Sequence, residues 1–341
     1  MLLTNKQPGI TRTEATKKEY LRRTRELSSR CRKELNLYSH EILDLRRFVG
    51  WLITQKSIWA RTTWRQYKAC VIYFLERQVE DQNDPIASEA LELLLPEDVE
   101  GCVLQTTKTS GVKMKKFPMK DFHKLNEYLK DNAGMWHEPL RRWLISALLT
   151  GLRPNEWSNT TYTQKDGEDA LVIINAKNTN GRSHGPSRTL LLGNLTQEER
   201  DIIKKHVEVS NEWNMHEQFT VFYQACASTL GRLSRKIWPK RSQYVSLYSA
   251  RHQFSADAKA SGFTREEIAA MMGHAVDETA TIHYGRKTAG YTLCRVRPVP
   301  EEVNKIRNTY QSRFTGENEI KPVDLISKKQ IKPHILNKDD K

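Results

Sequence analysis

Apolar residues recur at helical spacing through the N-terminal part of the chain. Between Tyr38 and Gln55 they form one broad face, and from Tyr67 to Leu75 they recur along one side. A shorter apolar run ends before Pro96, where a helix is expected to stop. The pattern predicts helices over residues 13–35, over 38–55, over a segment capped by Thr62 or Thr63, and over 87–95. Residues 1–104 are therefore predicted to form a helical domain.

Beyond residue 118, segments with helical spacing alternate with short runs typical of strands. The runs 170–175 and 188–192 are predicted strands, and Asn180-Gly181 between them favours a hairpin-type reversal. Helical spacing is found over 119–132, 138–149, 197–213, 220–238, 248–261 and 264–272. The pattern predicts a mainly α fold with a small antiparallel β-sheet, in a second domain over residues 118–314.

The distribution of charge along the chain indicates what kind of partner the protein binds. The 341 residues carry a formal net charge of +14. Five lysines and no acid lie between Gln105 and Lys120, and six lysines or arginines and no acid lie between Gln218 and Ala256. Clustered positive charge is typical of a protein that binds a polyanion, most often nucleic acid. The alternative is a basic protein whose charge is incidental.

Composition also limits which cellular compartment and which kinds of site are expected. The five cysteines are scattered and form no Cys-x-x-Cys pair, so neither a zinc site nor a disulfide framework is predicted, and a reducing cytoplasm is expected. The mean hydropathy is −0.68, and no apolar run reaches the roughly 18 residues of a membrane span. The N-terminus lacks the apolar stretch of a signal peptide. Neither a membrane span nor a signal peptide is therefore predicted.

The two predicted domains are joined by residues 105–117, which contain glycine, hydroxyl residues and lysines without a hydrophobic period. We interpret this segment as a basic linker, either a solvated tether or a strand that follows a polyanion. Near the other end, Val303, Ile306, Tyr310 and Phe314 are spaced by three and four residues, which predicts an amphipathic helix over 300–314. Its apolar face would dock on its own domain or on a neighbouring copy, and residues 315–341 would form a polar tail.

Four widely separated residues suit one reaction. Arg153 and Arg251 can bind a phosphate diester, because a guanidinium fork matches two phosphoryl oxygens. Tyr284 can attack phosphorus and hold it covalently, and His274 can orient the phosphate or handle a proton. Together they indicate chemistry on a phosphodiester.

The spacing of these residues resembles that of the tyrosine recombinase (phage integrase) family. Residues 147–156 resemble the first arginine box, Thr-Gly-x-Arg-x-x-Glu. Residues 251–284 resemble the second box, with an Arg-His dipeptide, a helix, Gly262, a short helix, Gly273-His274 and then a tyrosine. The resemblance covers residues from about 38 to about 290.

The resemblance implies a two-domain DNA clamp, with a helical core-binding domain and a mixed α/β catalytic domain. It implies cleavage and rejoining of double-stranded DNA at specific recombination sites through a 3′-phosphotyrosyl intermediate, with no cofactor and no metal. A homotetramer on DNA, integration or excision of a mobile element, and a cytoplasmic, nucleoid-associated location follow from it. An accessory directionality factor is a further candidate partner.

The resemblance also assigns roles to individual residues. Tyr284 would be the nucleophile, Arg153 and Arg251 the phosphate clamp, and His274 a hydrogen-bonding partner of the phosphate. Lys177, after the first predicted strand, would protonate the leaving 5′-hydroxyl. Because the sequence does not fix the register of the strands, Lys165, Arg182 and Arg188 are competitors for that role. Glu156 would orient a neighbouring residue. His252 and His283 would have structural roles.

Tyr248 departs from the family pattern. The family usually has histidine, sometimes lysine, three residues before the second arginine. A phenol can donate a hydrogen bond to a phosphate but is a poor general base at neutral pH. We include Tyr248 in the predicted site, and its presence puts the activation of Tyr284 in question more than the class of reaction.

Two other functions are compatible with the sequence. A type IB topoisomerase-like enzyme would use a similar set of residues as a monomer, relaxing DNA without sequence choice. A catalytically inactive DNA-binding accessory factor would keep the basic surfaces and lose the reaction. The compact helical N-terminal domain favours recombination over relaxation, and the complete set of Arg153, Arg251, His274 and Tyr284 argues against loss of catalysis.

Overall fold

A computed structural model describes residues 12–38, 40–103, 113–176, 178, 182–279, 284 and 286–309. These residues form mostly helices and one four-stranded antiparallel sheet, which confirms the predicted fold class. The two largest clusters of buried hydrophobic side chains within them are separate, one before residue 103 and one after residue 113. Among the described helices, none is long and apolar enough to cross a membrane.

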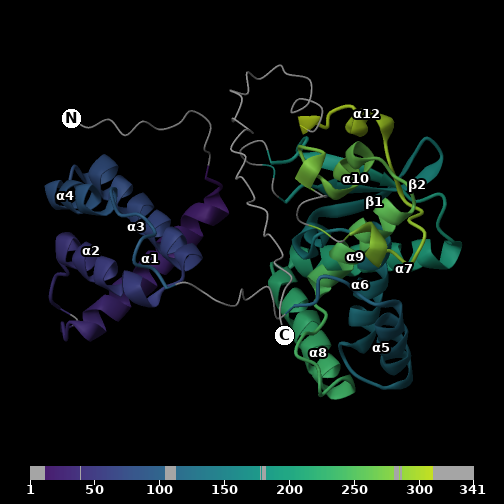
Figure 1. The fold of residues 1–341 in the computed structure, drawn as a ribbon, viewed down its shortest axis with the longest axis horizontal. Coiled ribbons are helices and arrows are strands. Elements are labelled where there is room, and N and C mark those ends of the chain that lie inside the picture. The colour runs from purple at the N-terminus through teal and green to yellow at the C-terminus, as the bar shows by residue number, and fades with distance from the viewer. Residues whose placement is uncertain are drawn as a thin grey trace, which may run out of the picture.

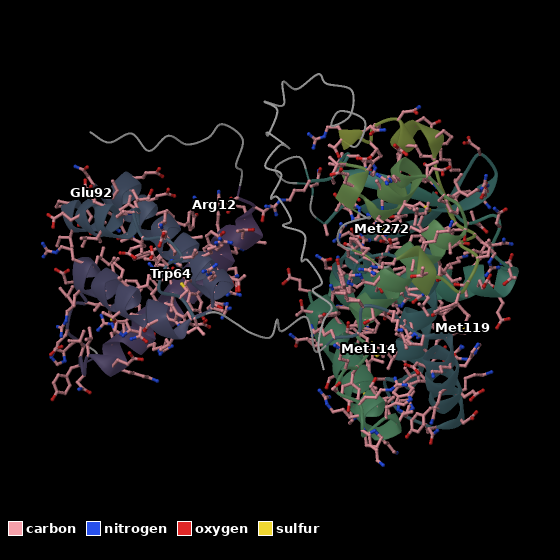
Figure 2. All side chains as sticks on the ribbon, in the orientation of Figure 1. Arg12, Trp64, Glu92, Met114, Met119 and Met272 are labelled. Atoms are coloured by element: carbon pink, nitrogen blue, oxygen red, sulfur yellow. The ribbon has the colours of Figure 1, made fainter. Side chains whose placement is uncertain are left out.

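The first cluster lies between the helices coloured purple to blue in Figure 1. They are α1 (Glu14–Glu34), α2 (Leu45–Thr54), a 3-10 turn η1 (Gln55–Ile58), α3 (Arg61–Gln82) and α4 (Pro85–Leu94). Phe48, Leu52, Trp64 and Leu75 are almost completely buried at their centre. Figure 2 shows Trp64 inside this group of helices. The broad apolar faces seen in the sequence therefore pack against one another.

Two helix starts differ from the prediction. Helix α2 begins at Leu45 and not near Tyr38, because the Asp44 carboxylate accepts hydrogen bonds from the backbone N–H of Arg46 and Arg47 at 2.8 and 3.2 Å. Helix α3 begins before the two threonines, at Arg61, after an extended Ala60 that gives no side-chain cap. In both places the apolar pattern predicted the helix but not the residue at which it starts.

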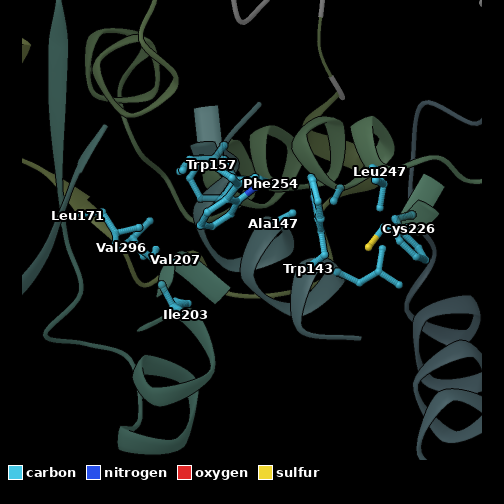
Figure 3. Close-up of a cluster of buried hydrophobic side chains, with 14 of the residues drawn as sticks. Trp143, Ala147, Trp157, Leu171, Ile203, Val207, Cys226, Leu247, Phe254 and Val296 are labelled. Carbon is cyan, nitrogen blue, oxygen red and sulfur yellow. The ribbon is translucent and has the colours of Figure 1, made fainter. Parts of the chain in front are cut away.

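The second cluster lies among six helices and the sheet. The helices are α5 (Met119–Asp131), α6 (His137–Thr150), α7 (Gln197–Met215), α8 (Phe219–Ile237), α9 (Leu247–Ala260) and α10 (Arg265–Met272). Figure 3 shows part of this core, with Trp143, Ala147, Phe254 and Leu247 drawn among the helices and Leu171 on the sheet. The two arginine-bearing segments described below are anchored in this core.

The sheet contains β1 (Thr160–Lys165), β2 (Glu168–Ile174), β3 (Ser187–Leu191) and β4 (Arg297–Pro298), in that spatial order. The two predicted strands correspond to β2 and β3, which pair antiparallel with Ala170 opposite Leu191. Strands β1 and β4 were not predicted. The sequence of β1 is mostly polar, and β4 has only two residues, so neither shows a hydrophobic alternation.

Part of the predicted linker belongs to the second core. The backbone N–H of Met114 donates to the carbonyl of Tyr244 at 3.0 Å, and Phe117 is completely buried. Residues 105–112 of the linker lie outside the described residues, as do Asn180 and Gly181 of the predicted reversal.

The helix predicted over 300–314 forms at its start and is then interrupted within its described part. Helix α12 (Pro300–Val303) ends after one turn, and Ile306 packs against Ala269 and Ala270 of α10 in the same chain. The chain then pairs with the segment after α10, where Arg307 N–H donates to the Ala275 carbonyl at 3.0 Å. These hydrogen bonds between distant segments replace those that would continue a helix. Residues 310–341, including the predicted tail, lie outside the described residues.

Candidate active site

A sharp turn at the end of α6 places Arg153 in the site. Gly151 ends the helix with a φ of +68°, and a Cβ on it would lie 2.2 Å from the Phe254 ring, so only glycine fits there. The chain then enters the 3-10 turn η3 (Pro154–Asn159) with Arg153 as its first flanking residue. The Glu156 carboxylate accepts from the Arg153 backbone N–H at 2.7 Å and from its Nη1 at 2.6 Å. The guanidinium of Arg153 is thereby fixed in direction.

Helix α9 presents two of the predicted residues on one face. Tyr248 and Arg251 are three residues apart, so their side chains lie on the same side of the helix. His274 follows the left-handed Gly273 that ends α10, and its backbone N–H bonds to the Ala269 carbonyl at 2.9 Å. Helix ends and one helix face therefore bring these residues together from distant parts of the sequence.

The Tyr284 hydroxyl lies at the meeting point of these segments. It is 2.8 Å from the Tyr248 hydroxyl and accepts from Arg251 Nε at 3.3 Å. Arg153, Tyr248, His274 and Tyr284 line one open pocket of about 530 Å³. Arg251 is completely buried and contacts the pocket through Tyr284. The structure thus brings five of the six predicted site residues together.

The arginines differ in how fully their donors are used. Arg251 Nη1 and Nη2 donate to the carbonyls of Gly151 and Met272 at 2.7 and 2.6 Å, while Nε donates to Tyr284. Arg153 is bonded through Nη1, and its buried Nε has no hydrogen-bond partner among the described residues. Arg153 therefore has one nitrogen that these hydrogen bonds leave unused, whereas Arg251 is directed at the Tyr284 oxygen.

His274 is neutral and has a defined tautomer. Arg251 Nη2 lies 3.2 Å from His274 Nε2, and because a guanidinium has no acceptor, Nε2 accepts and the ring proton is on Nδ1. Burial, with the charges of Arg251 and Arg153, lowers the pKa of His274 well below its usual value. Its buried Nδ1–H has no hydrogen-bond partner among the described residues.

The two phenols have opposite pKa shifts. Burial raises the pKa of Tyr284, but the Arg251 charge and the hydrogen bonds from Tyr248 and Arg251 outweigh burial and lower it to about 8. Burial raises the pKa of Tyr248 to about 12, with the Arg251 charge opposing that rise. Tyr248 therefore stays protonated and donates to Tyr284, which is the phenol that ionises more easily.

A buried carboxylate joins the arginines. Glu156 accepts from Arg188 Nη2 at 2.7 Å as well as from Arg153, and Arg251 Nη1 lies 3.8 Å away. Burial would raise the pKa of Glu156, but the charges of Arg188, Arg251 and Arg153 hold it below its usual value. The expectation that Glu156 orients a neighbour therefore has a structural basis in these contacts.

The remaining candidates lie in different places. Lys177 and His283 are outside the described residues. Of the competitors for the role of Lys177, Arg182 lines the pocket, Lys165 lies on β1 at 3.9 Å from Glu301, and Arg188 is completely buried. His252 also lines the pocket, with its ring centroid 5.0 Å from that of Tyr284, and burial lowers its pKa to about 4.

Sequence reasoning missed Arg307 and the role of Arg188. Arg307 lines the pocket from the C-terminal segment, and nothing in the local sequence indicated this. Arg188 binds the buried Glu156, although a signal for it was present. It lies on the same inward face of β3 as Leu190, and a charged residue at such a position needs a buried partner.

Comparisons with known proteins give only distant similarities. No protein-family model and no curated protein matches the chain. Among solved structures it is similar to the Tn1549 transposon integrase in complex with a circular intermediate DNA, at 12% identity over 77% of this chain and 89% of that one, with a TM-score of 0.44. XerH site-specific recombinase bound to difH is 14% identical over 76% and 73%, with a TM-score of 0.43. A lambda integrase tetramer bound to a Holliday junction is 13% identical over 83% of each chain, with a TM-score of 0.31. Values this low assign no roles to residues.

Proposed function

We propose that this protein is a tyrosine recombinase that cleaves and rejoins double-stranded DNA through a covalent bond to Tyr284. One observation carries the proposal. The Tyr284 hydroxyl lies 3.3 Å from the Nε of the buried Arg251 and opens into the pocket lined by Arg153. A nucleophilic oxygen held beside guanidinium groups matches what attack on a phosphodiester requires.

The reaction exchanges one phosphate ester for another. The Tyr284 oxygen forms a bond to phosphorus while the bond from phosphorus to the 5′ oxygen breaks, and that oxygen leaves with a proton. Attack by a 5′-hydroxyl from another strand reverses the step and releases Tyr284. By the family resemblance, Lys177 supplies the proton. Because one phosphodiester-type bond is made for each one broken, the strand can be rejoined without an added energy source.

Arg153 and His274 would bind the non-bridging oxygens. Both line the pocket, and each has a buried nitrogen without a partner among the described residues. Negative charge grows on those oxygens in the transition state, so donors fixed in a partly buried pocket stabilise it. Removing the Arg153 side chain should cost about 3–4 kcal/mol of transition-state stabilisation, by comparison with oxyanion-hole donors.

Tyr248 would act as a hydrogen-bond donor and not as a base. It lies 2.8 Å from the Tyr284 oxygen, and its raised pKa keeps its proton on at neutral pH. A phenol that donates to a phenolate stabilises the ionised nucleophile. In this proposal the proton of Tyr284 leaves through the open pocket, and Tyr248 and Arg251 favour that loss.

The wider biological role follows from the resemblance. We extend the proposal to integration or excision of a mobile element by a homotetramer at specific sites, with a directionality factor as a candidate partner. Residues 12–103 would act as the core-binding domain, since they have a hydrophobic core of their own.

A covalent-trapping assay tests the reaction. The protein is incubated with nicked suicide duplexes spanning the DNA that flanks its own gene, and protein–DNA adducts that survive SDS are measured. Wild type should form an adduct and Tyr284→Phe should not. Tyr223→Phe, a change of the same size on α8 outside the pocket, should keep it.

Other outcomes would favour the alternatives. Tight binding without an adduct in wild type would favour the inactive DNA-binding factor. Relaxation of any supercoiled plasmid by the monomer would favour the topoisomerase.

A further inference from the structure

We propose that Arg188 is a positioning residue that neutralises Glu156, so that the charges of Arg153 and Arg251 remain available to Tyr284 and the phosphate. The inference rests on the proposed function and deepens it. Arg188 is completely buried, does not line the pocket, and would act only through its neighbours.

Arg188 has hydrogen-bond partners on three different segments. Its Nη1 and Nη2 donate to the two oxygens of Glu156 at 3.2 and 2.7 Å. Nη1 also donates to Asn175 Oδ1 at 2.5 Å, and Nε donates to the Met271 carbonyl at 2.8 Å. The residue thus joins β3 to η3, to the end of β2 and to the last turn of α10, directly before Gly273 and His274.

The charges explain why a third arginine is needed. Glu156 is completely enclosed and fixes Arg153 through both its backbone N–H and Nη1. A carboxylate is suited to that task, but its negative charge would offset one of the guanidinium groups. Arg188 supplies the compensating charge from the side of Glu156 away from the pocket lining.

The resulting balance fits the proposed reaction. Within this buried cluster, three guanidinium groups and one carboxylate leave a net charge of +2 beside Tyr284, and Arg182 and Arg307 line the pocket as well. Attack of a phenolate on a phosphodiester gives a pentacovalent phosphorus with two negative charges, so a net positive charge in this cluster stabilises the transition state. Loss of Arg188 would leave Glu156 to offset Arg153 and Arg251, and Tyr284 would ionise less easily.

The first experiment removes the charge and keeps the length. Arg188→Met should slow single-turnover adduct formation at saturating DNA on the order of 10- to 100-fold, less than loss of a group that touches the transition state. The dissociation constant for DNA should change little, because Arg188 does not reach the pocket. The pKa of Tyr284, followed by tyrosinate absorbance in the DNA-free protein, should rise above its value of about 8.

A second variant separates charge from packing. Arg188→Met combined with Glu156→Gln removes one charge of each sign, and should recover part of the rate and return the Tyr284 titration toward wild type. Arg188→Lys should also recover part of both. These two variants are the test where Arg188→Met alone does not fold.

A matched control is Arg241→Met, which removes an arginine paired with the buried Asp121 elsewhere in the same core. It should lower thermal stability without moving the titration of Tyr284. The inference is overturned if Arg188→Met and the double variant both leave the titration of Tyr284 and the rate of adduct formation unchanged. It is also overturned if the double variant forms the adduct more slowly than both single variants. Wild-type adduct formation is the separate test of the proposed function, so the two failures are distinguishable.

Discussion

At the scale of single residues, the chemistry of the pocket depends on what surrounds the Tyr284 oxygen. Arg251 and Tyr248 both donate to it, and both lower its pKa against the effect of burial. The phenolate fraction rises with pH through about 8, so the rate of adduct formation should rise over the same range and level off above it. The pH at which the rate is half-maximal is therefore a measure of this environment.

Replacing Tyr248 tests that environment. Tyr248→Phe removes the donor at 2.8 Å, so the pKa of Tyr284 should rise and the rate profile should move to higher pH. Each unit of pKa reduces the phenolate at neutral pH about tenfold. The measurement is single-turnover adduct formation as a function of pH, at saturating DNA. An unchanged profile would contradict the assigned role, and Tyr223→Phe is the control for a lost phenol outside the pocket.

At the scale of elements, the turn after α10 places His274. Gly273 has a φ of +66°, and a Cβ there would lie 2.4 Å from Asn175 Oδ1 and 2.8 Å from Arg188 Nη1. The turn therefore requires glycine both for its backbone angle and for space. It carries the chain from the last turn of α10, which Arg188 holds, to His274 at the pocket.

Two glycine variants distinguish the effect of the backbone angle from the effect of space for a Cβ. Gly273→Ala and Gly262→Ala both place alanine at positive φ, at a cost of about 1–2 kcal/mol each. Only Gly273→Ala also meets neighbouring atoms, since nothing lies within 4 Å of a Cβ at Gly262. Thermal unfolding should show the larger loss for Gly273→Ala, and only that variant should slow adduct formation. Equal rates for the two variants would show that the turn does not position His274.

At the scale of the whole molecule, the described residues contain two main hydrophobic cores, and each should unfold with its own transition. Leu52 belongs to the first and Leu144 to the second. Leu52→Ala should cost about 2–5 kcal/mol and lower the melting temperature of one calorimetric transition, while Leu144→Ala should lower that of the other. A single transition that both variants shift equally would contradict two independent cores.

The overall charge of +14 gives a second prediction at this scale. Binding of DNA releases counterions, so the dissociation constant should rise steeply with salt, on the order of 10³-fold or more between about 50 and 200 mM if several phosphates are contacted. Binding isotherms at four or five salt concentrations give the slope. Arg188→Met should leave that slope unchanged, because its side chain is buried. A dissociation constant independent of salt would contradict a mainly electrostatic interface.

The order of residues along the chain determined the class of fold and the candidates for the site. Hydrophobic spacing is a local property, so it predicted the long helices and the strands β2 and β3. Residue type and spacing around Arg153, Arg251, His274 and Tyr284 indicated phosphodiester chemistry, because those groups suit it wherever they meet.

Only the tertiary structure decided how these residues interact. The distance between the two phenol oxygens, the tautomer of His274 and the pairing of Arg188 with Glu156 arise from contacts between segments far apart in sequence. The same holds for strands β1 and β4 and for the early end of α12, where pairing with distant residues outweighs local pattern. Local sequence encodes propensity and chemical type, while burial, charge balance and pKa depend on which distant groups pack together.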